Sequence, residues 1–286
     1  MTGGVALLVA TLIGVFITPD GIVVGADTSL SNRRGPLASQ QKYCVTGPRA
    51  VATLQGAYLL RDTVTNATIE LHERFRDLCS RIGGTLPAMT LRAQARYIAE
   101  TLKADLIAFF ERMPAVEVVT TYSSSPVVAR IAVTGYGDSG PESVVVGLGI
   151  ATEKQTNRWE AQVQDLPRLT FAACGVRFHG QEVVVAALAR DTDARVPRAE
   201  RQQPDVARLS TLVRGGCTDV SVHSAPAMFL QAMRLTVMLG DRFGIPRGTV
   251  GPPIDIVVIP REGPVDVRRI ASWNESIPDS QPPTPK

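Results

Sequence analysis

Two short apolar runs separated by Pro19-Asp20-Gly21 are the feature that most constrains how this chain can fold. Residues 11–18 and 22–27 are rich in valine and isoleucine, and the residues between them favour a tight turn. Together they predict an antiparallel hairpin, which returns the chain to the place where it began. We therefore expect the Thr11 hydroxyl, at the start of the first strand, to face the Asp27 carboxylate at the end of the second.

Cleavage of the Ala10–Thr11 bond would add a free amine to this pair. A threonine whose own α-amine serves as its base is an activated nucleophile. The pKa of a free α-amine, ~7.7–8.0, lies close to the pH at which a general base works best. The apolar run from Val5 to Ile17 has 13 residues, fewer than the ~20 that a membrane helix needs. The end of a signal region and the end of an ordinary propeptide both fit this run.

The composition limits the function classes. Hydrophobic residues make up 44% of the 286 residues and charged residues 20%, which is typical of a globular protein. The net charge of +3 comes without a basic run, so we expect no nucleic-acid partner. Lysine is scarce: Lys42, Lys103, Lys154 and Lys286 are the only lysines among the 30 basic residues. An internal lysine in such a chain is therefore a candidate for a specific role.

The four cysteines predict neither a metal site nor a defined disulfide. Cys44, Cys79, Cys174 and Cys217 form no C-x-x-C pair and no metal-binding spacing with a histidine. We expect no metal and no organic cofactor, with buried free cysteines as the default.

Apolar periodicity predicts strands first, then two helices, then strands, then helices and a last strand. The expected strands are 42–46, 50–54, several segments from 116 to 173 (among them 127–134, 143–150 and 160–164) and 254–259; the expected helices are 57–78, 90–113, 181–189 and 225–242. This order predicts an α+β fold, a four-layer αββα sandwich of two mainly antiparallel sheets between helix pairs. Residues 1–10 would be a propeptide or signal remnant, 11–270 one domain, and 271–286 a disordered Pro/Ser-rich tail.

Four residues converge near the start of this arrangement: Thr11, Asp27, Lys42 and Gly56. Lys42 begins the third predicted strand. Gly56 ends the fourth and is expected to open the first long helix, where a backbone N–H without an intrahelical partner is available to an anion.

The spacing of these residues resembles the proteasome β-subunits and related bacterial ring proteases, members of the N-terminal-nucleophile (Ntn) hydrolase superfamily. The matching segments are Thr11–Val15, Asp20–Thr28, Ala38–Lys42 and Ala52–Gly56. The resemblance is specific over residues 11–60 and only topological from there to about residue 260.

The resemblance implies a catalytic role for each of the four residues. Thr11 would be the nucleophile and, through its α-amine, the general base. Lys42 would favour the deprotonated nucleophile, a role that suits a flexible ammonium better than a guanidinium, and Asp27 would hold Lys42. Gly56 would donate its N–H to the oxyanion.

The sequence departs from the family pattern in two places. Ala10 stands where self-processing members carry glycine, which favours another protease as the activator. The family's supporting serine–aspartate–serine group has no clear counterpart, and Asp241 and Thr249 are only candidates for it.

Structural interpretations of the same motifs compete with catalysis. Thr11 and Asp27 could be ordinary strand ends, Lys42 a solvated charge and Gly56 a helix-start glycine. Gly137-Asp138-Ser139-Gly140-Pro141 resembles the nucleophile loop of trypsin-like proteases. That mechanism needs a matched histidine and aspartate, which the expected helices do not supply, so we interpret the segment as a turn between strands.

The expected function is therefore that of a threonine-type endopeptidase acting on peptides or unfolded proteins, with subunits in a homo-oligomeric ring and no membrane span. The alternatives are an inactive ring-forming subunit with an intact Ala10–Thr11 bond, and an Ntn amidase acting on small amides. The compartment stays open: cytoplasmic by the resemblance, exported if residues 1–10 are a signal remnant.

Overall fold

The structure is a computed structural model, and it forms two compact units. It describes residues 5–9, 12–32, 35–39, 41–62, 68–82, 86–123, 127–166, 169–170, 174–180, 183–188, 190, 193–216, 219–245 and 250–273. The first unit comprises residues 1–10 and 40–170, and the second comprises residues 11–39 and 171–286.

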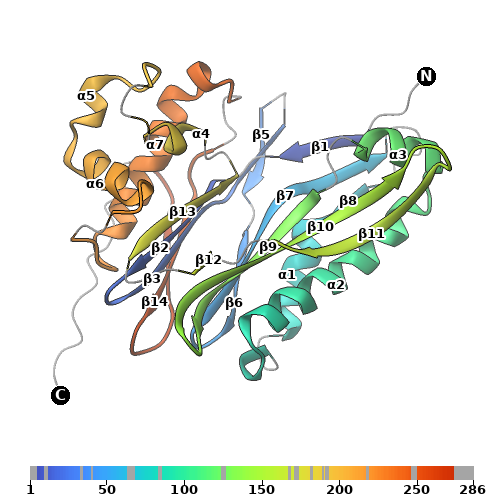
Figure 1. The fold of residues 1–286 in the computed structure, drawn as a ribbon, viewed down its shortest axis with the longest axis horizontal. Helices are drawn as coiled ribbons and strands as arrows, with labels where there is room; N and C mark the ends of the chain where they lie inside the picture. The colour runs from blue at the N-terminus through green and yellow to red at the C-terminus, as the bar shows by residue number, and fades with distance from the viewer. Residues whose placement is uncertain are drawn as a thin grey trace. The chain divides into compact units, whose positions relative to one another are not determined.

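The first unit is built on an antiparallel sheet (Figure 1). Its main path runs through β1 (Val5–Val9), β7 (Ala50–Asp62), β9 (Val127–Gly137), β10 (Gly140–Glu153) and β11 (Arg158–Asp165). Three shorter strands pair with this path: β6 (Tyr43–Gly47) and β8 (Thr68–Glu70) with β7, and β12 (Leu169–Thr170) with β10. The predicted strands 42–46, 127–134, 143–150 and 160–164 all belong to this sheet.

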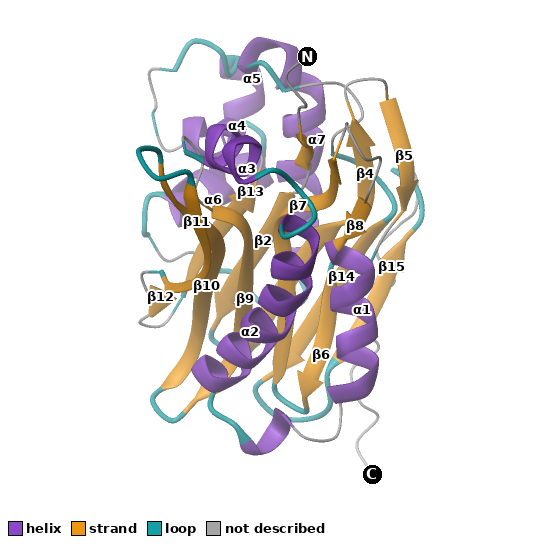
Figure 2. Cartoon of the chain, turned by 90° about the vertical axis from the view of Figure 1, so that its right-hand side faces the viewer, coloured by secondary structure: helices purple, strands orange, loops and turns teal. Residues whose placement is uncertain are grey.

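Helices pack on the sheet of the first unit. They are α1 (Leu71–Ile82), the 3₁₀ turn η1 (Leu86–Ala88), α2 (Leu91–Phe110) and α3 (Ala115–Tyr122). Figure 2 shows α1 and α2 packed over the face of this sheet, running roughly along its strands. The α2 helix is capped by Thr90, whose hydroxyl accepts a hydrogen bond from the N–H of Ala93 at 3.2 Å. It buries the apolar stripe that its sequence predicts, from Leu91 to Phe109.

Two sequence predictions in the first unit are wrong. Residues 57–62 of the expected helix 57–78 are strand, because β1 and β8 both pair with that part of β7. Within the expected range, the helix that the structure describes is the part that belongs to α1, from Leu71 onward. The strand expected from Val116 is helix α3. Its Tyr122 packs edge-on against Phe110 of α2, with ring centroids 5.0 Å apart, so tertiary packing overrides the β propensity of its valines.

The second unit has a five-stranded antiparallel sheet. Its order is β13 (Gly175–Gly180), β2 (Leu12–Thr18), β3 (Gly21–Asp27), β14 (Ile254–Pro260) and β15 (Asp266–Ile270). A separate pair joins β4 (Ser29–Asn32) to β5 (Gly35–Ser39). The helices are α4 (Val183–Leu188), α5 (Arg198–Arg201), α6 (Pro204–Val213) and α7 (Ala225–Phe243).

Helix α7 packs on this sheet over a pair of glycines. Gly14 of β2 and Gly25 of β3 lie opposite each other in the register. A Cβ on Gly25 would lie 2.2 Å from the ring of Phe229, and one on Gly14 would lie 2.7 Å from it. Phe229 has no exposed surface, so the two missing side chains make the room for its ring.

The expected fold class is confirmed: the chain is α+β, with two mainly antiparallel sheets and helices packed on each. None of the helices that the structure describes is both long enough and apolar enough to cross a bilayer.

Candidate functional site

The β2–β3 hairpin has the geometry that its sequence predicts. The register pairs Ile13 with Ala26 and Thr18 with Gly21 around the Pro19–Asp20 turn. The Thr18 hydroxyl donates to the Asp20 carboxylate at 2.7 Å, and that contact fixes the turn. The start of β2 therefore lies beside the end of β3.

Asp27 is anchored at this end of the hairpin. Its Oδ1 accepts a hydrogen bond from the N–H of Leu12 at 2.8 Å, and the side chain has no exposed surface. The next residue, Thr28, donates its hydroxyl to the carbonyl oxygen of Pro253 at 2.7 Å. The carboxylate thus contacts the residue that follows Thr11 in the chain. Ala10 and Thr11 themselves lie outside the described residues.

Lys42 belongs to the first unit and has no exposed surface. Its carbonyl oxygen accepts a hydrogen bond from the N–H of Leu54 at 3.0 Å, which ties the start of β6 to β7. Lysine is among the residues least often fully buried. The competing interpretation of Lys42 as a solvated charge is therefore wrong.

Gly56 lies inside β7, opposite Ala129 of β9, and not at the start of a helix. The expectation that Gly56 opens a helix, and that its backbone N–H lacks an intrahelical partner for that reason, is therefore wrong. The backbone still requires glycine here: φ is +102°, and a Cβ would lie 2.6 Å from the carbonyl oxygen of Val128. Its role as an oxyanion donor stays a prediction.

Of the two candidate support residues, the structure describes Asp241. Asp241 lies in the last turn of α7, where its carbonyl oxygen accepts from the N–H of Gly244. Thr249 lies outside the described residues.

The cysteines differ from expectation. Cys44 of β6 and Cys79 of α1 form a disulfide with their Cα atoms 5.8 Å apart, and Cys174 is disulfide-bonded as well. No described cysteine is free. The prediction of buried free thiols is therefore wrong, because residues 35 positions apart become neighbours only once α1 packs beside β6.

Glu70, His72 and Glu73 form the one group in the described part of the chain whose ligand atoms, all within 4.8 Å of one another, could surround a metal ion. His72 is buried, and its Nε2 lies 3.7 Å from Glu70 Oε2. The three residues lie within four consecutive positions of the sequence, and this spacing could have suggested the group. Partly exposed carboxylates commonly lie together without an ion, so no metal is assigned here.

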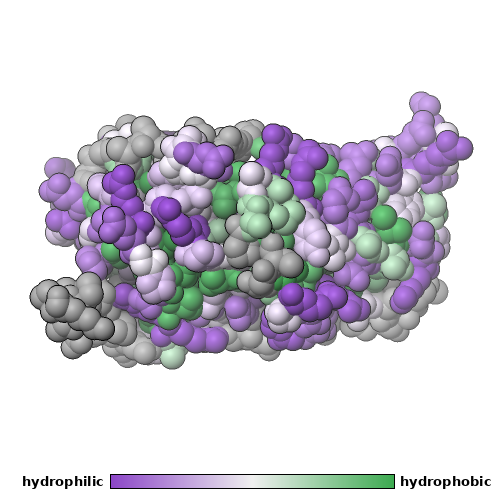
Figure 3. All heavy atoms as spheres, turned by 90° about the horizontal axis from the view of Figure 1, so that it is seen from below, coloured by the Kyte–Doolittle hydropathy of each residue, from purple (hydrophilic) through white to green (hydrophobic). Residues whose placement is uncertain are grey.

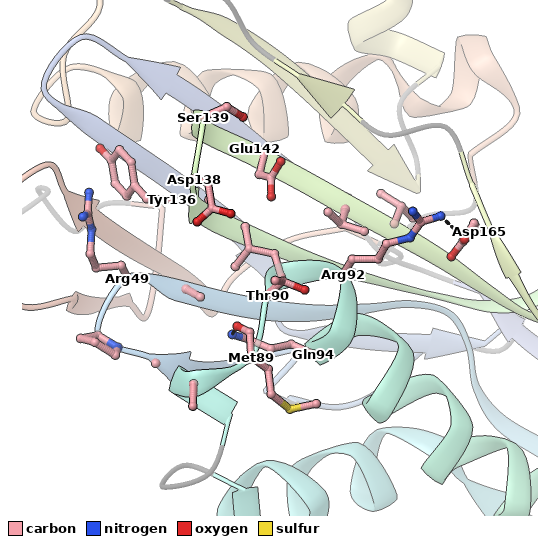
Figure 4. Close-up of a pocket in the computed structure, with 18 of the residues that line it drawn as sticks. Arg49, Met89, Thr90, Arg92, Gln94, Tyr136, Asp138, Ser139, Glu142 and Asp165 are labelled. Carbon is pink, nitrogen blue, oxygen red and sulfur yellow. Dashed lines mark hydrogen bonds and ion pairs between the residues drawn. The ribbon is translucent and has the colours of Figure 1, made fainter.

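A pocket of about 830 Å³ lies wholly within the first unit, and no local sequence pattern predicts it. Four parts of the chain meet around it: the β6–β7 turn, the start of α2, the β9–β10 turn with the following part of β10, and the end of β11 (Figure 4). The Asp138–Ser139 turn confirms the interpretation of Gly137–Pro141 as a connection between strands, and it forms one wall of the pocket.

Charged side chains of both signs line this pocket. The Arg49 guanidinium lies over the ring of Tyr136, 4.2 Å from its centroid. Asp165 pairs with Arg96 and Arg92 of α2. Hydrogen bonds from Arg96 and then Arg92 lower the pKa of Asp165 to about 2. This ion-pair cluster fixes the start of α2 against the end of β11.

No protein-family model and no curated protein sequence matches the chain. Its fold is similar to that of solved structures. One is the helical assembly of the Anbu complex from Pseudomonas aeruginosa, with a TM-score of 0.50 and 13% sequence identity over 92% of this chain and 88% of that one. Another is an Anbu (Gly-1) mutant from Hyphomicrobium sp. strain MC1, with a TM-score of 0.48 and 15% identity over 93% of this chain and 90% of that one.

The P. aeruginosa likeness extends over almost the whole chain and, at this identity, shows the fold alone. The assignment to proteasome β-subunits, drawn from the N-terminal motifs, is wrong: the solved structure with which this chain shares its fold is an Anbu complex.

Proposed function

We propose that this chain is a self-associating subunit with the Anbu fold, and that its primary role is to build a homo-oligomer. The observation that carries the proposal is the fold likeness to a subunit of an assembled Anbu complex, which extends over 92% of this chain. Because the likeness covers 92% of this chain, it includes both units. The whole chain would therefore form one subunit.

The N-terminal segment supports a role that does not depend on a freed amine. Strand β1 pairs with β7 in the sheet of the first unit, with Val5 opposite Asp62 and Leu7 opposite Leu60. Cleavage before Thr11 would cut β1 from the chain that continues into β2. A paired strand at this position favours a subunit in which the N-terminal segment is retained.

Exposed apolar side chains on the second unit's helices support self-association. Val237 and Met238 of α7 are 49% and 53% exposed, and Val183 of α4 is 47% exposed. Helices α4 and α7 pack together. Apolar residues are also exposed on the face drawn in Figure 3, where polar residues lie among them. Protein–protein interfaces commonly contain both apolar and polar surface.

Light scattering coupled to size-exclusion chromatography tests the proposal. We expect a species of several subunits that Met238→Glu shifts towards monomer, because a buried charge without a partner opposes association. Arg242→Glu, an exposed change in the last turn of the same helix, is the matched control for adding negative charge. A purely monomeric wild type over the full range of micromolar concentrations would contradict self-association.

Threonine-type hydrolysis is the second candidate function. It is supported by the Asp27 carboxylate beside Leu12, the residue after Thr11, and by a lysine, Lys42, that is completely buried. In this hypothesis, cleavage frees the Thr11 amine, the Thr11 hydroxyl attacks the carbonyl, and the substrate would be a peptide or a smaller amide.

Intact-mass measurement separates the two candidates. A mass that lacks residues 1–10, with peptide hydrolysis that Thr11→Ala and Lys42→Met abolish, would support the hydrolase. Retention of residues 1–10 in an assembled protein without hydrolase activity would support the subunit whose role is assembly. Hydrolysis of small amides but not of peptide libraries would point to an amidase.

A further inference from the structure

One face of helix α7 carries an exposed stripe with an apolar centre and opposite charges at its two ends. Arg234, Val237, Met238 and Asp241 are all exposed, although much of the rest of α7 is buried in the core of the second unit. Residues three, four and seven positions apart lie on the same side of a helix. The stripe therefore places two apolar side chains between a cation and an anion.

The spacing of this stripe is symmetric. Arg234 lies three positions before Val237, and Asp241 lies three positions after Met238. Suppose that a second copy of α7 lies antiparallel against the first, with a two-fold axis between positions 237 and 238. Arg234 then faces the partner's Asp241, and Val237 faces the partner's Met238. A two-fold contact buries the same patch on both subunits, so that patch must be complementary to itself, and this stripe meets that condition.

The charges favour this orientation over a parallel one. In a parallel pair in the same register, Arg234 would lie beside the partner's Arg234, and Asp241 beside the partner's Asp241. Like charges in contact oppose association, whereas the antiparallel pair brings opposite charges together at both ends. The sign of each charge therefore specifies the direction of the second helix.

Arg234 is already held in place for such a contact. Its Nη2 donates to the carbonyl oxygen of Trp273 at 2.9 Å, and the guanidinium carbon lies 6.0 Å from the centroid of the Trp273 ring. A guanidinium has five N–H donors, so this hydrogen bond leaves donors for a carboxylate. A side chain that is ordered beforehand loses less conformational entropy when it pairs.

We infer that two copies of this chain associate through an antiparallel, two-fold contact between their α7 helices. Val237 and Met238 form its centre, and Arg234 pairs with the partner's Asp241 on both sides of the axis. The inference rests on the proposed function, self-association, and specifies the surface and the symmetry of one contact. All four residues belong to the second unit.

Charge reversal on the stripe tests the contact. The two-fold axis repeats each pair, so Arg234→Asp or Asp241→Arg alone brings two pairs of like charges together. We expect each variant to raise the dissociation constant at least ~10-fold in sedimentation equilibrium at low salt. Arg242→Asp is the matched control, because this exposed residue is turned by about 100° around α7 from Asp241. It should change the dissociation constant by less than ~3-fold.

The double variant Arg234→Asp, Asp241→Arg exchanges the two charges and restores opposite signs across the axis. We expect its dissociation constant to return to within ~3-fold of wild type, even though the hydrogen bond from Arg234 to Trp273 is lost. Independent effects of the two residues on folding would add instead. Recovery in the double variant is therefore specific to pairing between the two positions.

Chemical cross-linking reports the symmetry of the contact. Met238 lies next to the inferred axis, so a short bismaleimide should join two copies of Met238→Cys into a covalent dimer. No described cysteine is free, and the wild type measures the background. Val116→Cys, at a residue of α3 that is 52% exposed in the first unit, should give no more covalent dimer than the wild type.

The outcomes separate this contact from self-association itself. A monomeric wild type would contradict both. An oligomer whose affinity is unchanged by either charge reversal, whose double variant is as weak as the weaker single variant, or whose Met238→Cys form gives only background cross-linking would contradict the α7 contact alone. Circular dichroism verifies that each variant is folded. If one reversal prevents folding, the other reversal and the cross-linking still decide the matter.

Discussion

Removal of the Cys44–Cys79 disulfide should cost the first unit a large part of its stability. The bond joins β6 to α1 across 35 residues. The chain-entropy relation for a closed loop of that length gives about 4 kcal/mol at 25 °C, from the restriction of the unfolded chain. Domains have a total stability of roughly 5–15 kcal/mol, so the change is large enough to measure directly.

The perturbation is the double variant Cys44→Ala, Cys79→Ala. Alanine is suitable at Cys44 because that side chain is 5% exposed and a serine hydroxyl there would need a hydrogen-bond partner. Reduction with a thiol is less informative, because Cys174 is also disulfide-bonded.

Urea unfolding followed by tryptophan fluorescence provides the assay. Trp159 of β11 packs against Phe110 in the first unit, with ring centroids 5.8 Å apart. The second tryptophan, Trp273, belongs to the other unit. In a Trp273→Phe background the signal therefore reports the first unit alone. We expect the free energy of unfolding to fall by about 4 kcal/mol.

A decrease of less than ~1 kcal/mol in the free energy of unfolding would refute this reasoning. The loop-closure relation gives a much larger value for cysteines 35 residues apart. Alkylation of the native, unreduced protein provides an independent control. Labelling of Cys44 or Cys79 under those conditions would show that the two thiols are not paired. Single variants at either position should lose as much stability as the double variant, because either change breaks the same bond.

Two further predictions concern the packing of each unit. Gly25→Ala should destabilise the second unit by ~1–3 kcal/mol, because the new methyl group would lie 2.2 Å from the ring of buried Phe229; a urea-unfolding loss below ~0.5 kcal/mol would contradict the packing described. Asp165→Asn should lower the thermal midpoint at neutral pH, because the pKa of Asp165 is lowered to about 2 by Arg96 and Arg92. A depressed carboxylate pKa stabilises the fold above the unfolded value of ~3.9, so the difference from wild type should close as the pH falls through about 2; a difference that is constant from pH 7 to below pH 2 would refute this.

Local patterns predicted the elements whose signals lie within one segment. The turn at Pro19–Asp20, the start of α2 near Thr90 and the apolar stripe of α7 all depend on residues within a few positions of one another. The prediction was wrong for residues 57–62, which belong to β7, and for residues 68–70, which form β8. β7 continues as far as Asp62 because β1, about fifty residues earlier in the chain, pairs with it, and periodicity in a short apolar segment does not reveal such a partner.

The candidate site was predictable only in part, for the same reason. The hairpin spacing predicted that Asp27 would lie beside the start of β2, and the Leu12 N–H contact agrees with it. The expected helix start at Gly56 was wrong, since strand pairing on β7 extends beyond this residue. The combined roles of Thr11, Asp27, Lys42 and Gly56 stay a prediction.

The sequence by itself determined the hairpin, helices α2 and α7 and the α+β class, because turn residues and apolar periods act over distances of a few residues. Only the tertiary structure decided which cysteines pair, why Gly25 must lack a side chain, and that a charged pocket exists. Each of these features joins residues from distant segments, in the pocket's case from Gly47 to Leu166. Their proximity is a product of sheet pairing and helix packing, which no local pattern encodes.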